Sequence, residues 1–144
     1  MKTAVALALR LVLGAFWIWA GSTKIVGHFD AGPFLTAAVS RSTVAPEAVR
    51  LVLAGAIGHV ALPHVVAVNL VVPWLELAAG LSILLGIATA WGVAGAAAMS
   101  VLFLMCGAVS TNPLLLFGAV LLAMFHPYAR AWTLHASRSP ATTI

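Results

Sequence analysis

The chain is poor in charge. Of its 144 residues only 7% are charged, with seven lysines and arginines against three acids, while 63% are hydrophobic. Soluble domains carry about 25% charged residues, so the composition excludes an ordinary soluble domain and indicates a membrane protein. The basic residues are isolated from one another along the chain. Without a basic tract, binding to nucleic acid is excluded as well.

Cysteine is nearly absent, and histidine has no ligand pattern. The single Cys106 lies inside an apolar run, so it offers no disulfide framework, no CxxC redox pair and no zinc spacing. The five histidines are scattered, and no two of them have the spacing or depth to hold a haem between facing helices. The sequence therefore predicts no metal and no haem, and any redox chemistry would need a borrowed cofactor.

The chain is rich in long apolar runs. Four segments have the length of spanning helices: about 3–26, 64–88, 91–109 and 112–133. The last three are joined by short turns, at 88–90 and 110–111, and short turns force neighbouring helices to run antiparallel. The sequence predicts a single domain (residues 1–144) of all-α class, an integral membrane up-down four-helix bundle.

The long connection, residues 27–63, is predicted to be a polar capping segment outside the cytoplasm. Within it, Pro46 and Glu47 open a short helix whose apolar stretch, 51–62, is closed by Pro63 and is too short to cross a bilayer. This helix is expected at the interface or over the mouth of the bundle. A fifth span here is the alternative.

Location follows from the same pattern. The positive charges on the two sides are balanced, but the long polar cap favours a multi-pass protein of the inner (plasma) membrane with both termini in the cytoplasm. The first 27 residues also resemble a signal peptide, with Lys2 before an apolar stretch. Because Arg10 interrupts that stretch, we interpret it as a retained span, and cleavage is the alternative.

Each of the first two predicted spans has one helical face that carries its ionisable residues together with glycine, tryptophan, asparagine or proline. On the first span five residues recur at spacings of 4, 3, 4 and 3, which places them on one face: Arg10, Gly14, Trp17, Gly21 and Lys24. The second repeats the spacing: Asn69, Pro73, Glu76 and Gly80. Ionisable groups inside a membrane are costly, so these positions indicate a site or a structural pairing.

The depth of the charges predicts which of them meet. Measured from opposite edges of a bilayer core of about 30 Å, Arg10 and Glu76 fall at nearly the same level, whereas Lys24 falls near the outer boundary. We therefore expect an Arg10–Glu76 ion pair, with Lys24 in contact with lipid headgroups. A snorkelling Arg10 is the alternative. Glu76 either holds the helices together or forms a site that binds a ligand or moves a proton.

Two motifs resemble a known family. They are RLVLGAFWIWAGSTKI at 10–25 and VPWLELAAGLSILLG at 72–86, supported by HFDAGPF at 28–34 and the Asn112-Pro113 step. In order and spacing they resemble the DoxX and DoxD-like membrane proteins. The resemblance covers nearly the whole chain and implies a four-helix membrane redox module.

The resemblance also implies a function. Some members of that family are subunits of a thiosulfate:quinone oxidoreductase, in which thiosulfate becomes tetrathionate and electrons pass to quinone. By this resemblance Glu76, Arg10 and Lys24 are the candidate catalytic residues. The chain lacks a cysteine-bearing extension that would handle sulfur alone. A protein partner subunit is therefore expected.

Two readings of the function stay open at this point. In the first, the chain is a quinone-interacting redox subunit in contact with membrane lipid, and Glu76 exchanges the proton. The quinone would bind between the first two helices, in a pocket with four candidate binding residues: Trp17, Trp74, Gly21 and Asn69. In the second, the chain is a non-catalytic accessory or anchoring subunit of a larger membrane complex. Transport of a small solute or of protons is weaker, because one buried acid does not make a relay.

Overall fold

Helices form all the regular structure that is described. The computed structural model describes residues 2–44 and 48–125, without the side chains of residues 42–51. Its elements are α1 (Lys2–Val26), α2 (Gly32–Val44), α3 (Ala48–Ala56), the π-helical turn η1 (Ile57–Ala61), α4 (Val65–Leu85), α5 (Thr89–Met105) and α6 (Asn112–Met124). The predicted all-α class is confirmed over these residues.

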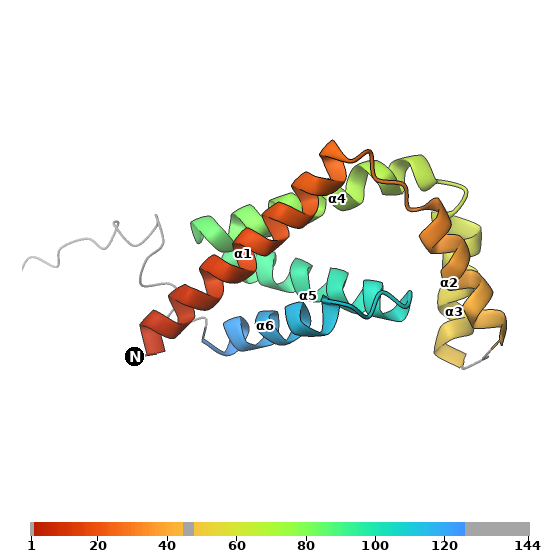
Figure 1. The fold of residues 1–144 in the computed structure, drawn as a ribbon. Coiled ribbons are helices and arrows are strands. Elements are labelled where there is room, and N and C mark those ends of the chain that lie inside the picture. Colours follow the sequence, from red (N-terminus) through yellow and green to blue (C-terminus); the bar gives the residue numbers. More distant parts are fainter. Residues whose placement is uncertain (1, 45–47, 126–144) are drawn as a thin grey trace, which may run out of the picture.

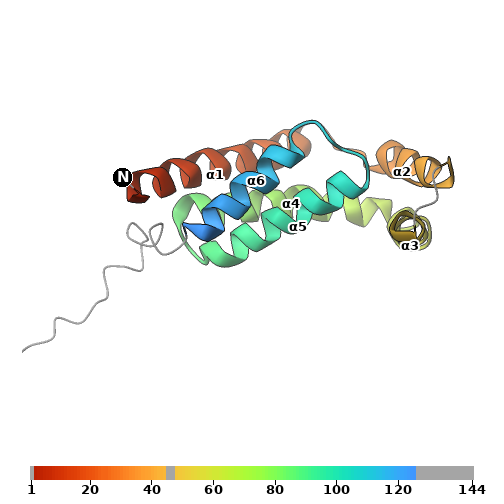
Figure 2. The same cartoon turned by 90° about the horizontal axis from the view of Figure 1, so that it is seen from below.

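Four of the helices pack around a common core. α1 lies along α4, α4 packs on α5, α5 on α6, and α6 closes back on α1 (Figures 1 and 2). Their buried side chains form one cluster: Ala6, Leu13, Trp17, Ile83, Val93, Ala96, Leu115, Ala119 and Leu122. The remaining helices, α2 and α3, lie across the end of this group that is opposite the N-terminus (Figure 1).

Two of these helices have the dimensions of membrane spans. By length and composition α1 and α4 are each able to cross a membrane, while α5, α6 and the stretch Val52–Ala61 are shorter apolar helices. The fourth predicted span, 112–133, begins as expected at Asn112, and its part beyond residue 125 lies outside the described residues. The transmembrane four-helix bundle stays a prediction.

Two helices end earlier than the sequence indicated, because the backbone turns left-handed. α4 ends at Leu85, where Gly86 has a φ of 73° and Ala88 a φ of 51°. The Ser82 hydroxyl supports this turn by donating to the carbonyl of Ile87 at 2.6 Å. α5, predicted to reach residue 109, stops at 105, and Gly107 follows with a φ of 90°.

The capping segment contains a helix that the sequence reading missed. Besides α3, whose predicted start at Pro46-Glu47 lies outside the described residues, α2 occupies residues 32–44. Its start is stabilised by the Asp30 carboxylate, which accepts the Gly32 N–H at 2.9 Å. Ala31, Leu35 and Ala38 are buried at spacings of 4 and 3. The same spacing identified α1, but the polar residues of this stretch obscured it.

Hydrogen bonds attach the cap to α4 and to the end of α5. The Ala31 N–H donates to Asn69 Oδ1 on α4 at 2.8 Å, and Arg41 Nη2 donates to the Cys106 carbonyl at the end of α5 at 2.8 Å. The buried Cys106 side chain belongs to the apolar cluster of the cap. The cap is therefore fastened at the start of α4 and at the end of α5.

Glycines bring the backbones of α1 and α4 into contact. A Cβ added at Gly21 would lie 2.7 Å from the Pro73 carbonyl oxygen, and one added at Gly80 would lie 2.6 Å from the Ile18 nitrogen. Gly14 faces the backbone of Leu84 in the same way. Because the opposing atoms belong to backbone, no side-chain movement can relieve such a clash.

Substitution of these glycines tests the packing. We expect Gly80→Ala to lower the free energy of unfolding in detergent by about 1–3 kcal/mol, because the two helices must separate. Gly95 is the matched control, since nothing lies within 4 Å of a Cβ added there. Gly95→Ala should be neutral or stabilising by up to about 1 kcal/mol. Equal effects of the two substitutions in a denaturation experiment would contradict the close contact.

Candidate functional site

A buried ion pair joins α1 to α4. Lys24 Nζ donates a hydrogen bond to Glu76 Oε1. The Glu76 side chain is 1% exposed and that of Lys24 is 26% exposed. The ammonium also lies 5.3 Å from the ring centroid of Phe29 and 5.0 Å from that of Phe103. Both ring faces attract the cation, so Lys24 is held by a carboxylate and two aromatic rings.

The predicted Arg10–Glu76 ion pair is wrong. Arg10 is buried, 4% exposed, but its Nη2 donates to the carbonyl of Leu84 at 3.4 Å. Lys24 is the residue that pairs with Glu76, in place of the lipid contact expected for it. The prediction identified the acid of the pair correctly and the base incorrectly.

The error came from the relative register of α1 and α4. Gly14 lies against Leu84, and Gly21 lies against Pro73, which places Arg10 far from Glu76 along the pair. Leu84 and Glu76 are eight residues apart, or about 12 Å along the helix. The depth estimate assumed that both helices end at the same level. In the structure Gly21 lies against Pro73, so the start of α4 at Val65 extends past the end of α1 at Val26, and α1 itself is longer than the assumed core.

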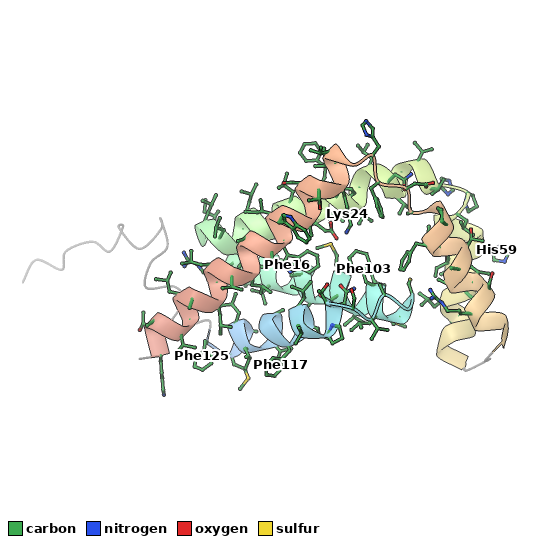
Figure 3. All side chains as sticks on the ribbon, viewed as in Figure 1. Phe16, Lys24, His59, Phe103, Phe117 and Phe125 are labelled. Carbon is green, nitrogen blue, oxygen red and sulfur yellow. The ribbon has the colours of Figure 1, made fainter. Side chains whose placement is uncertain are left out.

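The ion pair lies in the wall of a partly open cavity of about 410 Å³. The cavity lies among α1, the start of α6, the end of α5 and the first residues of the cap. Figure 3 shows Phe16 from α1 and Phe103 from α5 in the space near Lys24. The lining contains six aromatic residues: Phe16, Trp17, Trp19, Phe29, Phe34 and Phe103. Its few polar residues besides the pair include Thr23, Thr111 and Asn112.

Two buried polar atoms in this wall lack partners. Trp17 is 1% exposed, and its Nε1 has no hydrogen-bond partner among the described residues. The same holds for Glu76 Oε2, although Oε1 of that carboxylate is bonded to Lys24. Unpaired buried polar groups cost free energy, about 1–3 kcal/mol each. Two residues of the cavity lining therefore each keep one polar atom, a donor and an acceptor, without a partner among the described residues.

The other predicted site residues lie elsewhere. Trp74 does not line the cavity and is 54% exposed, because residues two positions apart on a helix face different sides. Gly21 is part of the α1–α4 contact, and Asn69 accepts the Ala31 N–H of the cap. Of the seven candidates, the cavity brings together Lys24, Glu76 and Trp17.

Sequence reasoning missed the aromatic residues that surround Lys24. Phe29 and Phe34 come from the start of the cap, and Phe103 comes from the last turn of α5, so no local spacing connects them. A partial signal was present in Phe16 and Trp19, which stack edge to face at 5.5 Å one helical turn apart. His59 lies in the cap, away from the cavity (Figure 3).

Comparisons with protein-family models, with curated proteins and with solved structures find no match to this chain. The resemblance to the DoxX and DoxD-like proteins stays a prediction. Within the described residues there is also no group of three or more His, Cys, Asp or Glu side chains able to hold a metal ion. The side chains that line the cavity therefore indicate what it can bind.

Double-mutant cycles test which base pairs with Glu76. We expect Lys24→Met alone to be destabilising by about 3 kcal/mol, because it leaves a buried carboxylate without its cation. Combined with Glu76→Gln, it should show a coupling energy of about 1–3 kcal/mol.

The matched cycle uses Arg10→Met with Glu76→Gln. Its coupling energy should stay below about 0.5 kcal/mol, as for distant sites. Chemical denaturation in detergent measures both cycles. Strong coupling of Glu76 to Arg10 and none to Lys24 would restore the rejected pairing.

Proposed function

We propose that the chain is a multi-pass membrane subunit of a redox system that binds a quinone in the Lys24–Glu76 cavity. The observation that carries the proposal is a buried ion pair in an aromatic wall beside two unpartnered polar atoms. The resemblance to DoxX and DoxD-like proteins points the same way. Enzymatic activity would require a partner subunit.

The residues present fit a quinone. A volume of about 410 Å³ falls in the range of small-molecule sites, roughly 300–1,000 Å³. Aromatic side chains suit a flat ring, which can stack on them or meet them edge to face. Trp17 Nε1 is a donor suited to a carbonyl oxygen, and the Lys24 ammonium adds a positive charge to the same cavity lining.

A bound quinone would accept two electrons and two protons and leave as the quinol. The electrons come from a reduced partner subunit, in keeping with the thiosulfate oxidation that the resemblance implies. Glu76 has the position of the proton donor and acceptor, since its free Oε2 belongs to a residue of the cavity wall. Lys24 is hydrogen-bonded to this carboxylate and would stabilise negative charge that develops beside it.

We place α1, α4, α5 and α6 across the inner membrane. α1 and α4 are long and apolar enough to span it, and α5 and α6 pack beside them. In this arrangement the termini lie in the cytoplasm and α2 and α3 outside it. The cavity then lies toward the outer side of the membrane, beneath the cap.

One observation favours the accessory role as a second candidate. The Lys24–Glu76 pair links α1 to α4 next to the glycine contact at Gly21, where an ion pair would fix the register of two helices. Buried polar pairs serve such a purpose in some helical assemblies. In this reading the cavity has no ligand, and the chain anchors a larger complex.

Glu76→Gln separates the two candidates. If Glu76 handles the proton, the variant should retain quinone binding but form quinol at least about tenfold more slowly, since general acid–base groups contribute roughly 10²–10⁴. The assay is reduction of bound quinone by the reduced partner subunit, followed by absorbance. Native mass spectrometry of the solubilised protein identifies the bound quinone and the co-purifying subunit.

Asp30→Asn is the matched control. Asp30 is an exposed acid outside the cavity lining, so its loss should leave the rate of quinol formation unchanged. Normal turnover of an assembled Glu76→Gln complex would favour the accessory role. Purified protein with neither bound quinone nor quinone-dependent turnover would rule out the redox role.

The proposed orientation is testable with introduced cysteines. Cys106→Ala removes the one native thiol. In that background Thr36→Cys, exposed on α2, should react with a membrane-impermeant maleimide in intact cells. Ile87→Cys, 53% exposed in the turn after α4, should react after lysis only. The reverse pattern would invert the topology, and labelling of both positions in intact cells would contradict the spanning arrangement.

A further inference from the structure

An apolar groove runs between α1 and α6. It has a volume of about 350 Å³. Apart from Thr111, all of its lining residues are apolar. Its outer walls are exposed: Val12 is 71% exposed, Leu114 72% and Phe117 62%. Figure 3 shows Phe117 on the outer side of α6. A groove of this kind accommodates hydrocarbon and offers nothing to a polar ligand.

The groove adjoins the Lys24–Glu76 cavity. Phe16, Thr111 and Leu115 line both. Along α1, the groove is lined from Leu9 to Phe16 and the cavity from Phe16 to Lys24, so the two follow each other along one face of the helix. The stretch from Leu9 to Phe16 corresponds to about 10 Å of helix.

The other sides of the cavity are less suited to hydrocarbon. The contact between α1 and α4 is closed at the level of the ion pair, where Gly21 touches the backbone of Pro73. Toward the cap stand the exposed Asp30 and the Arg41 that donates to the Cys106 carbonyl. The α1–α6 groove is therefore an apolar path from the cavity to the surface of the helices.

We propose that this groove holds the isoprenoid tail of the quinone whose ring lies in the cavity, and that the molecule enters from the lipid between α1 and α6. The inference rests on the proposed function and adds a second subsite to it. The ring and tail then occupy two connected compartments, one with polar atoms and one without. Phe16 lies at their junction.

Gly118 offers a way to fill the groove without touching the cavity. It lines the groove and not the cavity, and a Cβ added there would lie 3.3 Å from Leu13 Cδ1 on α1. A larger side chain at this position therefore occupies the space between the two helices. Gly95→Leu is the matched control, since a Cβ at Gly95 meets nothing within 4 Å.

The experiment measures binding of two probes to the full chain in detergent. One is a benzoquinone with a long isoprenoid tail, and the other has the same ring with a methyl group in place of the tail. Both are followed by quenching of tryptophan fluorescence, because Trp17 and Trp19 line the cavity. Gly118→Leu should weaken binding of the long-tailed probe about tenfold or more, a factor that corresponds to as few as two buried methylene groups. The short probe should bind as it does to the wild type, and Gly95→Leu should change neither.

Val12→Trp is the second variant, needed if Gly118→Leu does not fold. It fills the groove from its exposed wall and should show the same discrimination between the probes. Equal affinities of the two variants and the wild type for the long-tailed probe would overturn the inference and leave the proposed function intact. Loss of a co-purified phospholipid in Gly118→Leu, with probe binding unchanged, would also overturn it by assigning the groove to an acyl chain. A wild-type protein that binds neither probe would overturn both proposals.

Discussion

The backbone contact between α1 and α4 is the constraint on which the site depends. Gly14 and Gly21 on α1 and Gly80 on α4 allow the two helices to approach until backbone meets backbone. At such a distance the helices cannot slide past each other without a clash, so the register is fixed. That register puts Lys24 within reach of Glu76 and puts Arg10 beside the carbonyl of Leu84. A different register would create a different pair of charges.

Burial of the ion pair costs desolvation free energy, and this cost helps to decide between a structural and a ligand-binding role. Glu76 is almost inaccessible, and its attraction to Lys24 must offset the desolvation of both charges. A pair of well-packed apolar residues would hold the two helices at least as well. The unpartnered Oε2 and Trp17 Nε1 add to the cost. A ligand that bonded to these two atoms would offset that cost, which favours the redox proposal over the structural one.

The capping segment completes the cavity. Phe29 and Phe34 reach the cavity wall from the first residues of the cap, and their positions depend on two attachments. Asn69, expected as a ligand-binding residue, accepts the Ala31 N–H, and Arg41 donates to the Cys106 carbonyl. Asn69 therefore contributes to the site by positioning the cap. The ligand-facing surface is assembled from α1, α4, α5, α6 and the cap together.

The sequence by itself determined the helical class, the start of α6 at Asn112, the polar face of α1 and the acid of the ion pair, Glu76. These features depend on residues within about two helical turns of each other, so residue spacings that match a period of 3.6 predict them. The tertiary structure decided three other features. They are the pairing of Lys24 with Glu76, the position of Trp74 outside the cavity and the contact of Phe103 with Lys24. Each depends on how helices distant in sequence are offset and rotated against one another. That offset is set by which backbone segments of the two helices face each other, and the glycine spacing within either helix alone does not specify it.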